Sequence, residues 1–473
     1  MKDKIYITTT LPYINASPHI GFAREIIEAD VLARFYRSFG REVFFNTGTD
    51  EHGLKIFQKA KELGMDAQKY CDEKALEFDK LKSALNLSYD NFIRTNDQKH
   101  IEAVQKFWRI CDDNGYIYKK NYKVKYCVGC ELEKTDSELE NGECPLHPGK
   151  KVEEIEEENY FFRYSAFQEK LLELYEKNPD FVYPKFRMNE IRSFVSGGLR
   201  DFSISRVKEK MPWGVAVPED EEQVVYVWFD ALVNYISAIG WPDNLENFQK
   251  WWPAFQFCGK DNLRPQTAMW QAMLLAANLP QSQKVFVNGF INVNGQKMSK
   301  SLGNVISPYE MTEKFGIDGT RYLLLSFGNF GEDSDLNWDG MIEKYNADLA
   351  NGLGNLLSRV IKLSEELDYV PKNILDEKLK KEFGDLIENI ELGQALEIIR
   401  KKIDEANKYI AEEKPWESKK NNPEKFETAM KKLLENLNLI SELLVPFMPE
   451  TSEKIKKALK SKKLEEVLFQ RIK

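Results

Sequence analysis

The stretch Ile5-Tyr6-Ile7-Thr8-Thr9-Thr10 decides the fold that the sequence predicts. Its β-branched residues predict a short strand. After a loop with two prolines, we expect a helix from about Gly21 to Phe39 that Gly40 ends. Val43-Phe44-Phe45-Asn46 then predicts a second strand. A strand, a helix and a strand at this spacing indicate a βαβ unit, and therefore an α/β protein with a parallel sheet.

The strand–helix pattern is interrupted later in the chain and then resumes. Between about 117 and 154, cysteine, glycine and proline punctuate short strands, which is typical of an insertion. Alternation returns at Val224-Val225-Tyr226-Val227-Trp228, and we expect a helix after it, to about Ile239. Val285-Phe286-Val287 predicts another strand. We therefore expect one sheet that is split in the sequence by an insertion.

From about Met341 onward the sequence predicts only helices. An apolar residue recurs at gaps of four and three, which is typical of an amphipathic helix, at Leu349, Leu353, Leu356, Val360 and Leu363. A second such helix is expected from Phe426 to Leu444, ended by Pro446. The C-terminal part is thus predicted to be an all-α bundle.

The composition fits a protein with packed cores and sets few limits on its partners. Hydrophobic residues make up 42% of the 473 residues, too many for a disordered chain. No apolar run approaches the ~18 residues that a membrane span needs, and the first residues lack a secretory signal. We therefore expect a cytoplasmic protein without a membrane partner. The net charge of −9 neither supports nor excludes nucleic acid.

Two segments carry residue types that suit a nucleotide. His19-Ile20-Gly21 lies where a loop enters a predicted helix, whose unpaired N–H groups attract anions, and Gly21 lets a nucleotide approach the backbone. Lys297-Met298-Ser299-Lys300-Ser301 places two lysines beside serines, which suits the charge of a polyphosphate. Each segment alone also fits an ordinary helix entry or a solvated loop. Both together on one split sheet predict a nucleotide site.

Four residues in the insertion have the spacing of a metal site. Cys127, Cys130, Cys144 and His147 form the pattern C-x2-C-x13-C-x2-H. Two close pairs of thiol and imidazole ligands, separated by a hairpin-sized loop, suit tetrahedral zinc. Because the protein fills all four positions, we expect one structural zinc ion rather than a catalytic one.

The two nucleotide segments resemble the signature motifs of class I aminoacyl-tRNA synthetases. Further segments resemble the methionine–tRNA ligases within that class, namely 11–15 (Leu-Pro-Tyr-Ile-Asn), 47–53 (Thr-Gly-Thr-Asp-Glu-His-Gly), 212–214 (Pro-Trp-Gly), 226–231 (Tyr-Val-Trp-Phe-Asp-Ala) and 259–261 (Gly-Lys-Asp). These segments follow the family's order, and the resemblance extends through the helical tail. It is specific because several independent segments agree.

The resemblance implies a Rossmann-like catalytic domain that a zinc-knuckle insertion splits, followed by a helical anticodon-binding domain. The expected segments are the first catalytic half at 1–116, the insertion at 117–223, the second catalytic half at 224–295, a connecting segment with the lysine loop at 296–340, and the helical domain at 341–473. No room is left after the bundle for the dimerising domain of some members, so we expect a monomer.

The resemblance also implies an activity, namely the ATP-dependent activation of L-methionine and its transfer to tRNA(Met). The implied catalytic residues are His19, Lys297 and Lys300. The implied ATP-binding residues, with magnesium on the polyphosphate, are His19, Gly21, Lys260, Asp261, Lys297, Ser299 and Lys300. The implied methionine-binding residues, in which Asp50 meets the ammonium group and the others surround the thioether, are Leu11, Tyr13, Asp50, Trp228, Ala231, Tyr235 and Gln266.

In the helical tail, Asn351, Asn355 and Arg359 are spaced four apart, and Trp416 lies in Lys-Pro-Trp-Glu. Amides, an arginine and an aromatic ring suit splayed bases, and the resemblance implies that these residues read the anticodon of the tRNA. Periodicity alone fits a solvated helix face equally well. The anticodon assignment therefore depends on the resemblance.

The sequence departs from the family at two positions of the expected site. The first signature usually ends in a second histidine, which is Phe22 here, and a phenyl ring cannot donate to phosphate. Removing one preorganised donor typically costs ~10²–10³ in rate. Gln266 stands where the family has a histidine near the methionine, and Gln271 replaces a usual proline nearby. Gln266 still donates and accepts hydrogen bonds, so that change is the milder one.

Three alternatives stay open at this point. One is a class I synthetase for isoleucine, leucine, valine or cysteine, although the interruption at about 117–222 is too short for the large editing insertion of the branched-chain enzymes. Another is a synthetase-like tRNA-binding protein with weak or no aminoacylation activity, which Phe22 and Gln266 motivate. A zinc-dependent structural or nucleic-acid-binding module leaves both nucleotide segments unexplained.

Overall fold

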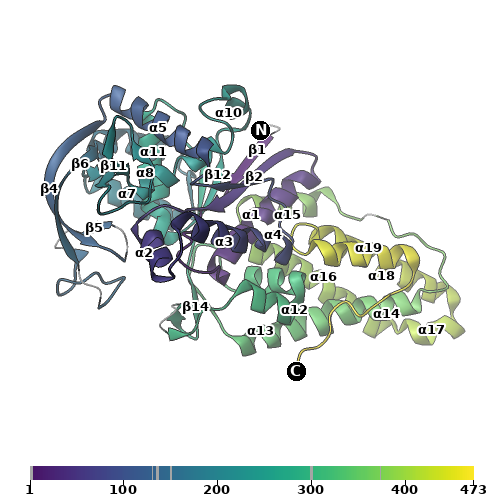
Figure 1. Cartoon of the computed structure of the whole chain (residues 1–473). Helices are drawn as coiled ribbons and strands as arrows, with labels where there is room; N and C mark the ends of the chain where they lie inside the picture. Colours follow the sequence, from purple (N-terminus) through teal and green to yellow (C-terminus); the bar gives the residue numbers. More distant parts are fainter. Residues whose placement is uncertain (1–3, 130–131, 135–137, 150–151, 299–301, 373) are drawn as a thin grey trace.

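The computed structural model describes residues 4–129, 132–134, 138–149, 152–298, 302–372 and 374–473. It contains an α/β part and an all-helical C-terminal part that extends away from it (Figure 1). The expected fold class, a parallel α/β sheet followed by a helical bundle, is confirmed at this level.

A six-stranded parallel sheet forms the centre of the α/β part, in the order β3-β2-β1-β12-β13-β7. Its strands are β1 (Lys4–Thr8), β2 (Glu42–Thr49), β3 (Asn91–Arg94), β7 (Val182–Tyr183), β12 (Phe255–Gly259) and β13 (Lys284–Asn288). The helix between β1 and β2 is α1 (Ile20–Ser38). The predicted strands at 5–10, 43–46 and 285–287 are confirmed as β1, β2 and β13, with shifted ends, and so is the helix between the first two.

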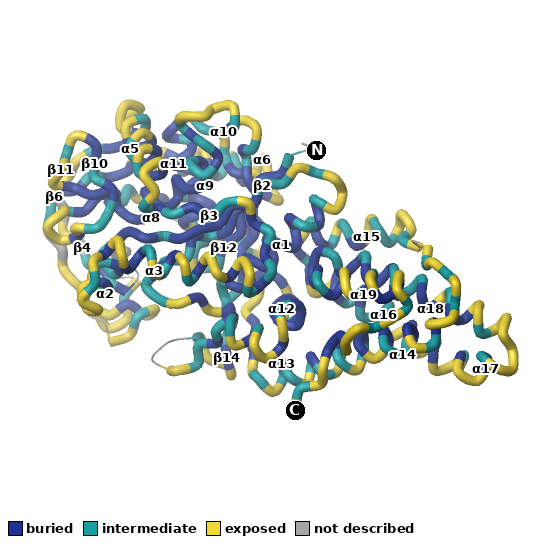
Figure 2. Tube along the Cα trace, turned by 45° about the vertical axis from the view of Figure 1, so that its right-hand side comes forward, coloured by how far each residue is buried: buried dark blue, intermediate teal, exposed yellow. Residues whose placement is uncertain are grey.

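Both faces of this sheet are buried, as a parallel sheet requires. Successive residues of β1 point to opposite faces, so Ile5 and Ile7 join one apolar core and Tyr6 joins the other. The core around Ile5 and Ile7 also contains residues of α1 and of the helical tail, which therefore shares a core with the sheet. Figure 2 shows the strands of the sheet as a buried centre, with exposed residues on the outer helices.

The strand expected at 224–228 is only partly correct. The strand β11 (Asp220–Val225) ends before Tyr226, and the helix α8 (Val227–Ala231) begins directly after it. In addition, β11 pairs antiparallel with β9 (Ser205–Val207) and β10 (Ala216–Val217), outside the parallel sheet. Alternating apolar residues indicate a strand but carry no information about the sheet in which it pairs.

The predicted insertion contains a long antiparallel ribbon (Figure 1). Its strands are β4 (Ile117–Cys127) and β6 (Glu153–Phe162), flanked by β5 (Leu132–Lys134) and β8 (Phe202–Ser203). The short strand β7 follows in sequence and pairs with β13, so the chain returns to the parallel sheet before β8. No local pattern of only two residues predicts such a strand.

The remaining helices of the α/β part connect these strands. They are α2 (Leu54–Glu62), α3 (Ala67–Asp79), α4 (Leu81–Ala84), α5 (Gln98–Asp113), α6 (Gln168–Lys177), α7 (Lys185–Ser196), α9 (Asn234–Ser237), α10 (Leu245–Trp251) and α11 (Trp270–Ala276), with the short turns η2 (Tyr164–Phe167), η3 (Lys260–Asn262) and η4 (Pro265–Met269). A small sheet of β14 (Ile291–Val293), β15 (Gln296–Lys297) and β16 (Ser334–Leu336) leads toward the tail.

The helical part begins with α12 and, after the short strand β16, continues from α13 to the C-terminus. Its elements are α12 (Pro308–Ser326), α13 (Trp338–Lys344), η6 (Tyr345–Gly354), α14 (Asn355–Leu363), α15 (Glu377–Glu388), α16 (Leu392–Glu413), α17 (Pro415–Asn421), α18 (Pro423–Leu444) and α19 (Pro449–Ser461). The predicted leucine-rich helix starts with the π-helical segment η6 before α14, and α18 matches the helix predicted to end at Leu444. Among the described residues, no helix is both long enough and apolar enough to cross a bilayer.

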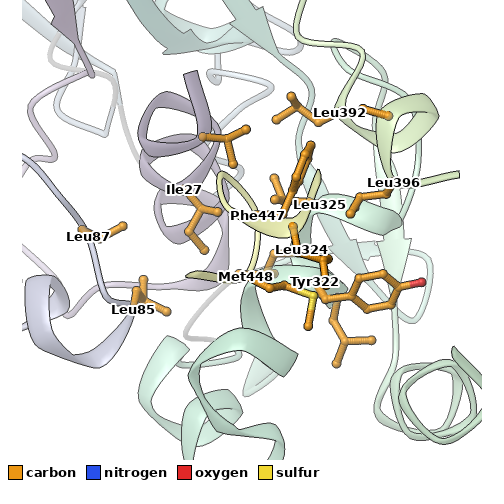
Figure 3. Close-up of a cluster of buried hydrophobic side chains, with 14 of the residues drawn as sticks. Ile27, Leu85, Leu87, Tyr322, Leu324, Leu325, Leu392, Leu396, Phe447 and Met448 are labelled. Atoms are coloured by element: carbon orange, nitrogen blue, oxygen red, sulfur yellow. The ribbon is translucent and has the colours of Figure 1, made fainter. Parts of the chain in front are cut away.

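A buried ion pair and an apolar cluster join the two parts of the molecule. The guanidinium of Arg321 on α12 lies 2.8 Å from the carboxylate of Asp30 on α1, and both side chains are fully buried. Arg321 also donates to the carbonyls of Pro446 and Phe447, between α18 and α19. Figure 3 shows apolar side chains of this junction, which come from α1, the segment directly after α4, α12, α16 and the same α18–α19 turn.

Candidate active site and metal site

The N-terminus of α1 carries the first predicted nucleotide segment. His19 is the N-cap of α1, and its Nδ1 accepts the N–H of Gly21 at 3.0 Å. A Cβ atom at position 21 would lie 2.8 Å from Cε1 of His19, so any other residue there would displace the imidazole from this cap. The first N–H groups of α1 and its dipole make this end of the helix attractive to an anion.

The second nucleotide segment approaches the same helix end, as far as the structure describes it. Met298 Cε lies 3.8 Å from where a Cβ at Gly21 would be, and Lys297 belongs to β15. Burial lowers the pKa of His19, an effect that Lys297 strengthens and Asp261 opposes, although the imidazole keeps an exposed edge. Ser299, Lys300 and Ser301 lie outside the described residues.

Lys260 lies in an arrangement that sequence reasoning missed. Its ammonium group lies 2.7 Å from both carboxylate oxygens of Asp333, and Asp333 also accepts the backbone N–H of Phe290 at 2.9 Å. The ammonium groups of Lys260 and Lys297 lie 4.3 and 4.4 Å from the centre of the Phe290 ring. Asp333 belongs to no motif, and the parallel pairing of β14 with β16 brings it here, so no local signal identifies it.

The predicted methionine-binding residues fall into two groups that the structure connects. Tyr13 and Asp50 form a parallel bridge, in which the N–H of Asp50 donates to the carbonyl of Pro12 at 3.0 Å. The hydroxyl of Tyr235 donates to Oε1 of Gln266 at 3.0 Å, and both side chains are buried. The structure thus brings Tyr13 to Asp50 and Tyr235 to Gln266.

The other predicted pocket residues are buried or half-buried. Leu11 and Ala231 are buried, and Trp228 is half-buried with its Nε1 atom enclosed. Trp228, Ala231 and Tyr235 do not share one continuous helix, because α8 ends at Ala231 and α9 begins at Asn234. Among the described residues, no hydrogen-bond acceptor meets Nε1 of Trp228 or Nε2 of Gln266.

Glu25 connects the two groups of pocket residues. Its Oε1 accepts the backbone N–H of Thr10, next to Leu11, at 2.8 Å. Burial raises the pKa of Glu25 to about 8, and the nearby charge of Asp261 also raises it. Glu25 in turn contributes to the raised pKa of Tyr235, after burial and Cys258. Through the bond to Thr10, Glu25 of α1 holds the segment of Leu11 against the helix that His19 caps.

A buried aspartate between two histidines supports α8. The carboxylate of Asp230 lies 2.6 Å from Nδ1 of His52 and 2.8 Å from Nε2 of His100. Burial raises the pKa of Asp230, but the two histidines outweigh burial and lower it below its usual range. Asp230 lies between Trp228 and Ala231, so this cluster fixes the helix that presents them. His100 lies in no motif and was missed.

Phe22 takes part in an apolar contact near the N-terminus of α1. Its ring makes an edge-on contact with Phe78 of α3, with ring centres 5.9 Å apart. The side chain is half-buried against the main apolar core. The replacement of a histidine by phenylalanine therefore adds to packing at this position and supplies no donor.

Three of the four predicted metal ligands lie together. The ligand atoms of Cys127, Cys144 and His147 are within 4.8 Å of one another, and both cysteines are buried. Gly129 makes room for the imidazole, because a Cβ there would lie 2.4 Å from Cγ of His147. Tetrahedral zinc with Zn–S bonds of ~2.3 Å needs ligand atoms roughly 3.5–4 Å apart, so this group fits the ion. Cys130 lies outside the described residues.

The predicted anticodon residues lie on the helical tail. Asn351 and Asn355 are exposed, on η6 and at the start of α14, while Arg359 is half-buried. The guanidinium carbon of Arg359 lies 5.5 Å from the centre of the Trp416 ring, and Trp416 is 44% exposed. The structure therefore brings Arg359 to Trp416, although they are far apart in the sequence, and leaves the ring accessible.

Comparisons with known proteins agree over nearly the whole chain. The family model for class I tRNA synthetases (M) matches residues 5–154 and 137–361, and the model for the anticodon-binding domain of methionyl-tRNA ligase matches 367–468. The methionine–tRNA ligase of Thermotoga maritima is 42% identical over 470 residues, 96% of this chain and 74% of that protein. That of Brucella suis is 40% identical over 475 residues, 96% of this chain and 91% of the relative.

Solved structures lead to the same family. Methionyl-tRNA synthetase from Mycobacterium tuberculosis in complex with methionyl-adenylate superposes with a TM-score of 0.90 and is 38% identical, over 96% of this chain and 93% of that one. The apo form of the M. tuberculosis enzyme gives a TM-score of 0.83 at 34% identity, over 96% and 91% of the two chains. This chain therefore belongs to the methionine–tRNA ligase family of class I tRNA synthetases.

Proposed function

We propose that this chain activates L-methionine with ATP and transfers the methionyl group to tRNA(Met). One observation supports the proposal, namely that the two nucleotide segments approach each other at the N-terminus of α1, where His19 is the N-cap and Met298 lies 3.8 Å from the Cβ position of Gly21. This arrangement occurs in a chain that is about 40% identical to methionine–tRNA ligases over most of its length. The alternative of a synthetase-like protein without aminoacylation activity is not favoured by that extent of similarity.

ATP occupies the helix end in this proposal. Gly21 permits its close approach, His19 contacts a phosphate, and Lys260 with Asp261 borders the nucleotide. Lys297, Ser299 and Lys300 approach the β- and γ-phosphates, and magnesium offsets the charge of the polyphosphate. The roles of Ser299 and Lys300 rest on the sequence motif. The methionine carboxylate attacks the α-phosphorus, the bond to the bridging oxygen breaks, and pyrophosphate leaves while cations stabilise its charge.

Methionine lies between the two groups of pocket residues. Asp50 accepts hydrogen bonds from the ammonium group, and Leu11, Tyr13, Trp228, Ala231, Tyr235 and Gln266 enclose the side chain. Aromatic rings favour a thioether, because each sulfur–aromatic contact adds roughly 0.3–1.5 kcal/mol. The enclosed donors of Trp228 and Gln266 give this pocket a polar end for an acceptor atom.

The tRNA binds across both parts of the molecule. A ribose hydroxyl at its end attacks the methionyl carbonyl, and AMP leaves. Asn351, Asn355, Arg359 and Trp416 read the anticodon, with the exposed Trp416 ring as a stacking surface for a base. We further propose that the chain acts as a monomer in the cytoplasm, where translation supplies its substrates, with the domains at 1–116, 117–223, 224–295, 296–340 and 341–473.

Zinc is proposed as a structural ion, held by Cys127, Cys130, Cys144 and His147. When bound, it cross-links the two ends of the knuckle and supplies no chemistry to the reaction. We expect metal analysis to find one zinc per chain and Cys144→Ser to lose it, with a lower melting temperature for the variant. The matched change Cys111→Ser, in a buried thiol on α5, should keep the zinc. The zinc site is refuted if the wild-type protein contains no metal and Cys144→Ser leaves the melting temperature unchanged.

The activity is tested by methionine-dependent exchange of labelled pyrophosphate into ATP. Isoleucine, leucine, valine and cysteine serve as competing substrates. We expect exchange with methionine alone and a loss of about 10²–10³ in rate for Lys300→Ala, since it removes a charge that faces the leaving group. Lys431→Ala, a lysine on the helical tail, should leave the rate unchanged. Exchange with another amino acid would refute the specificity, and none at all would refute activation.

A further inference from the structure

A fully buried glutamine lies behind the proposed amino-acid pocket, at the start of α11. Nε2 of Gln271 donates to the backbone carbonyl of Gln266 and to Oγ of Ser282, both at 3.0 Å. Its Oε1 accepts the backbone N–H of Ser282, also at 3.0 Å. Both N–H groups and the oxygen of this amide are thus engaged by the protein itself. Such a saturated buried amide has a fixed orientation.

The partner of Gln271 lies in an irregular helical turn. Gln266 belongs to the π-helical turn η4, in which the N–H of Trp270 donates to the carbonyl of Pro265. A π turn shifts the backbone hydrogen bonds by one residue, so the regular α-helical ladder does not fix its carbonyls. The side chain of Gln271 supplies an additional bond to one of them. It therefore limits where the backbone of Gln266 can lie.

The same network connects the pocket to the central sheet. Oγ of Ser282 forms a short hydrogen bond with Oε1 of Gln256 in β12. On the other side, Oε1 of Gln266 accepts the hydroxyl of Tyr235 at 3.0 Å. Gln256, Ser282, Gln271, Gln266 and Tyr235 thus form one buried series of polar groups. It begins on a rigid strand and ends on a residue that the proposed function places around methionine.

We propose that Gln271 is a positioning residue for the amino-acid pocket. It holds the backbone of Gln266 and, through the side chain of Gln266, the hydroxyl of Tyr235. The enclosed Nε2 of Gln266 then stays directed at the ligand, because its own amide oxygen is fixed by Tyr235. This inference rests on the proposed function, since it assigns Tyr235 and Gln266 to the methionine side chain. It adds a residue that does not itself touch the substrate.

The test is Gln271→Met, which keeps the length of the side chain and removes its hydrogen bonds. We expect the KM for methionine in pyrophosphate exchange to rise about tenfold, the equivalent of one lost hydrogen bond, with kcat and the KM for ATP within about twofold. The matched control is Gln223→Met. Gln223 is also buried, but it lies in β11, outside the parallel sheet. Its amide oxygen accepts the hydroxyl of Ser205, and its amide nitrogen donates to the carbonyl of Glu158. This control should leave both KM values within about twofold.

A double-variant cycle separates positioning from a general loss of structure. If Gln271 acts through Tyr235, adding Gln271→Met to Tyr235→Phe should raise the KM for methionine by less than about twofold more. A purely structural role predicts the full tenfold effect in either background. Ser282→Ala removes one partner of Gln271 and gives a milder second variant, with an expected rise of about threefold.

The outcomes distinguish this inference from the proposed function. If the wild-type chain exchanges pyrophosphate with methionine, but Gln271→Met and Ser282→Ala leave the KM for methionine unchanged, the positioning role is refuted and the function stands. Equal rises in the KM for methionine and ATP, or additive effects in the cycle, also refute it. A wild-type chain without methionine-dependent exchange refutes the proposed function and this inference with it.

Discussion

Charged side chains in the interior of the molecule, at the junction of its two parts and behind α8, and those on its outer helices have opposite environments. Asp30 and Arg321 meet at the junction with both side chains 0% exposed, and Asp230 is equally buried between two histidines. On the tail, Arg400 and Glu397 are each 41% exposed, one helical turn apart. Buried charges must be paired to be tolerated, whereas exposed pairs contribute little to stability.

This difference shows which charges determine the geometry. Arg321 bonds α1, the end of α4 and the α18–α19 turn at the same time, so it sets how the tail sits on the sheet. Among the described residues, the hydrogen bonds and ion pairs of Arg400 go to Glu397 and Asp404 on its own helix. In the sequence, Arg321 and Arg400 are both arginines near acidic residues, and only their different burial in the structure distinguishes them.

The largest effect is expected from Arg321→Met. The change leaves Asp30 with less compensation in a buried site, so the free energy of unfolding should fall by about 3–5 kcal/mol in urea titrations. Burial raises the pKa of Asp30, but Arg321 and Arg34 outweigh burial and lower it. This carboxylate therefore stabilises the fold above its unfolded pKa, and the gain is lost as the pH falls through the folded value.

In Arg321→Met the stability that Asp30 contributes at neutral pH should shrink, so the variant is expected to lose less stability than the wild type on acidification. The double change with Asp30→Leu should regain part of the loss, because it removes the buried charge. If Arg321→Met alone lowers the free energy of unfolding by less than about 1 kcal/mol, the Asp30–Arg321 pair is no more important than an exposed ion pair.

Glu25→Gln tests a buried carboxyl that forms no ion pair with any residue that the structure describes. Burial raises the pKa of Glu25 to about 8, above the unfolded value of 4.5, so the native state holds a proton that the unfolded state has released. Wild-type stability should therefore fall as the pH rises between these values. The glutamine stays neutral, so its advantage over the wild type should grow by about 2–4 kcal/mol from pH 5 to pH 8.

Denaturant titrations at both pH values measure this advantage, with Glu427→Gln on the exposed face of α18 as the control. The control should show no pH-dependent difference. Parallel stability curves for Glu25→Gln and the wild type would mean that Glu25 ionises normally in the folded protein.

Trp416→Ala tests whether the exposed part of the tail serves binding. Loss of a stacking ring should weaken tRNA binding by about 1–3 kcal/mol. Stability and pyrophosphate exchange should not change, because Trp416 is 44% exposed and distant in the fold from the sheet. The aminoacylation KM for tRNA measures the effect, and Val370→Ala, at another exposed apolar residue, is the control. An unchanged KM would remove Trp416 from the proposed anticodon site.

The smallest effect is expected from Lys431→Ala on α18. Its ammonium pairs with Glu427 one turn away, and the two side chains are 42% and 51% exposed. The free energy of unfolding should change by less than about 0.5 kcal/mol, and less again at high salt. If Lys431→Ala lowered the free energy of unfolding as much as Arg321→Met, burial would not be what makes an ion pair important for stability.

The sequence by itself determined those features whose signals are local. The β-branched run at 5–10, the glycine after the first helix and the leucine spacing of the tail predict their elements, because periodicity and chain stops act within a few residues. The motif segments around His19 and Lys297 predict the nucleotide residues, and the family resemblance implies their roles. Where the motif failed, at Phe22, the sequence could report the lost donor but not the contact with Phe78 that replaces it.

The tertiary structure decided what depends on partners distant in the chain. β11 reads as a strand of the parallel sheet, yet it pairs in a separate antiparallel sheet, and the two-residue strand β7 joins the parallel one. His100 reaches Asp230, Asp333 reaches Lys260 and Gln271 reaches Ser282 only because sheet order and loop paths bring them together. The type of its side chain determines which chemical groups a residue is able to bond, whereas strand order and burial determine which partner it meets.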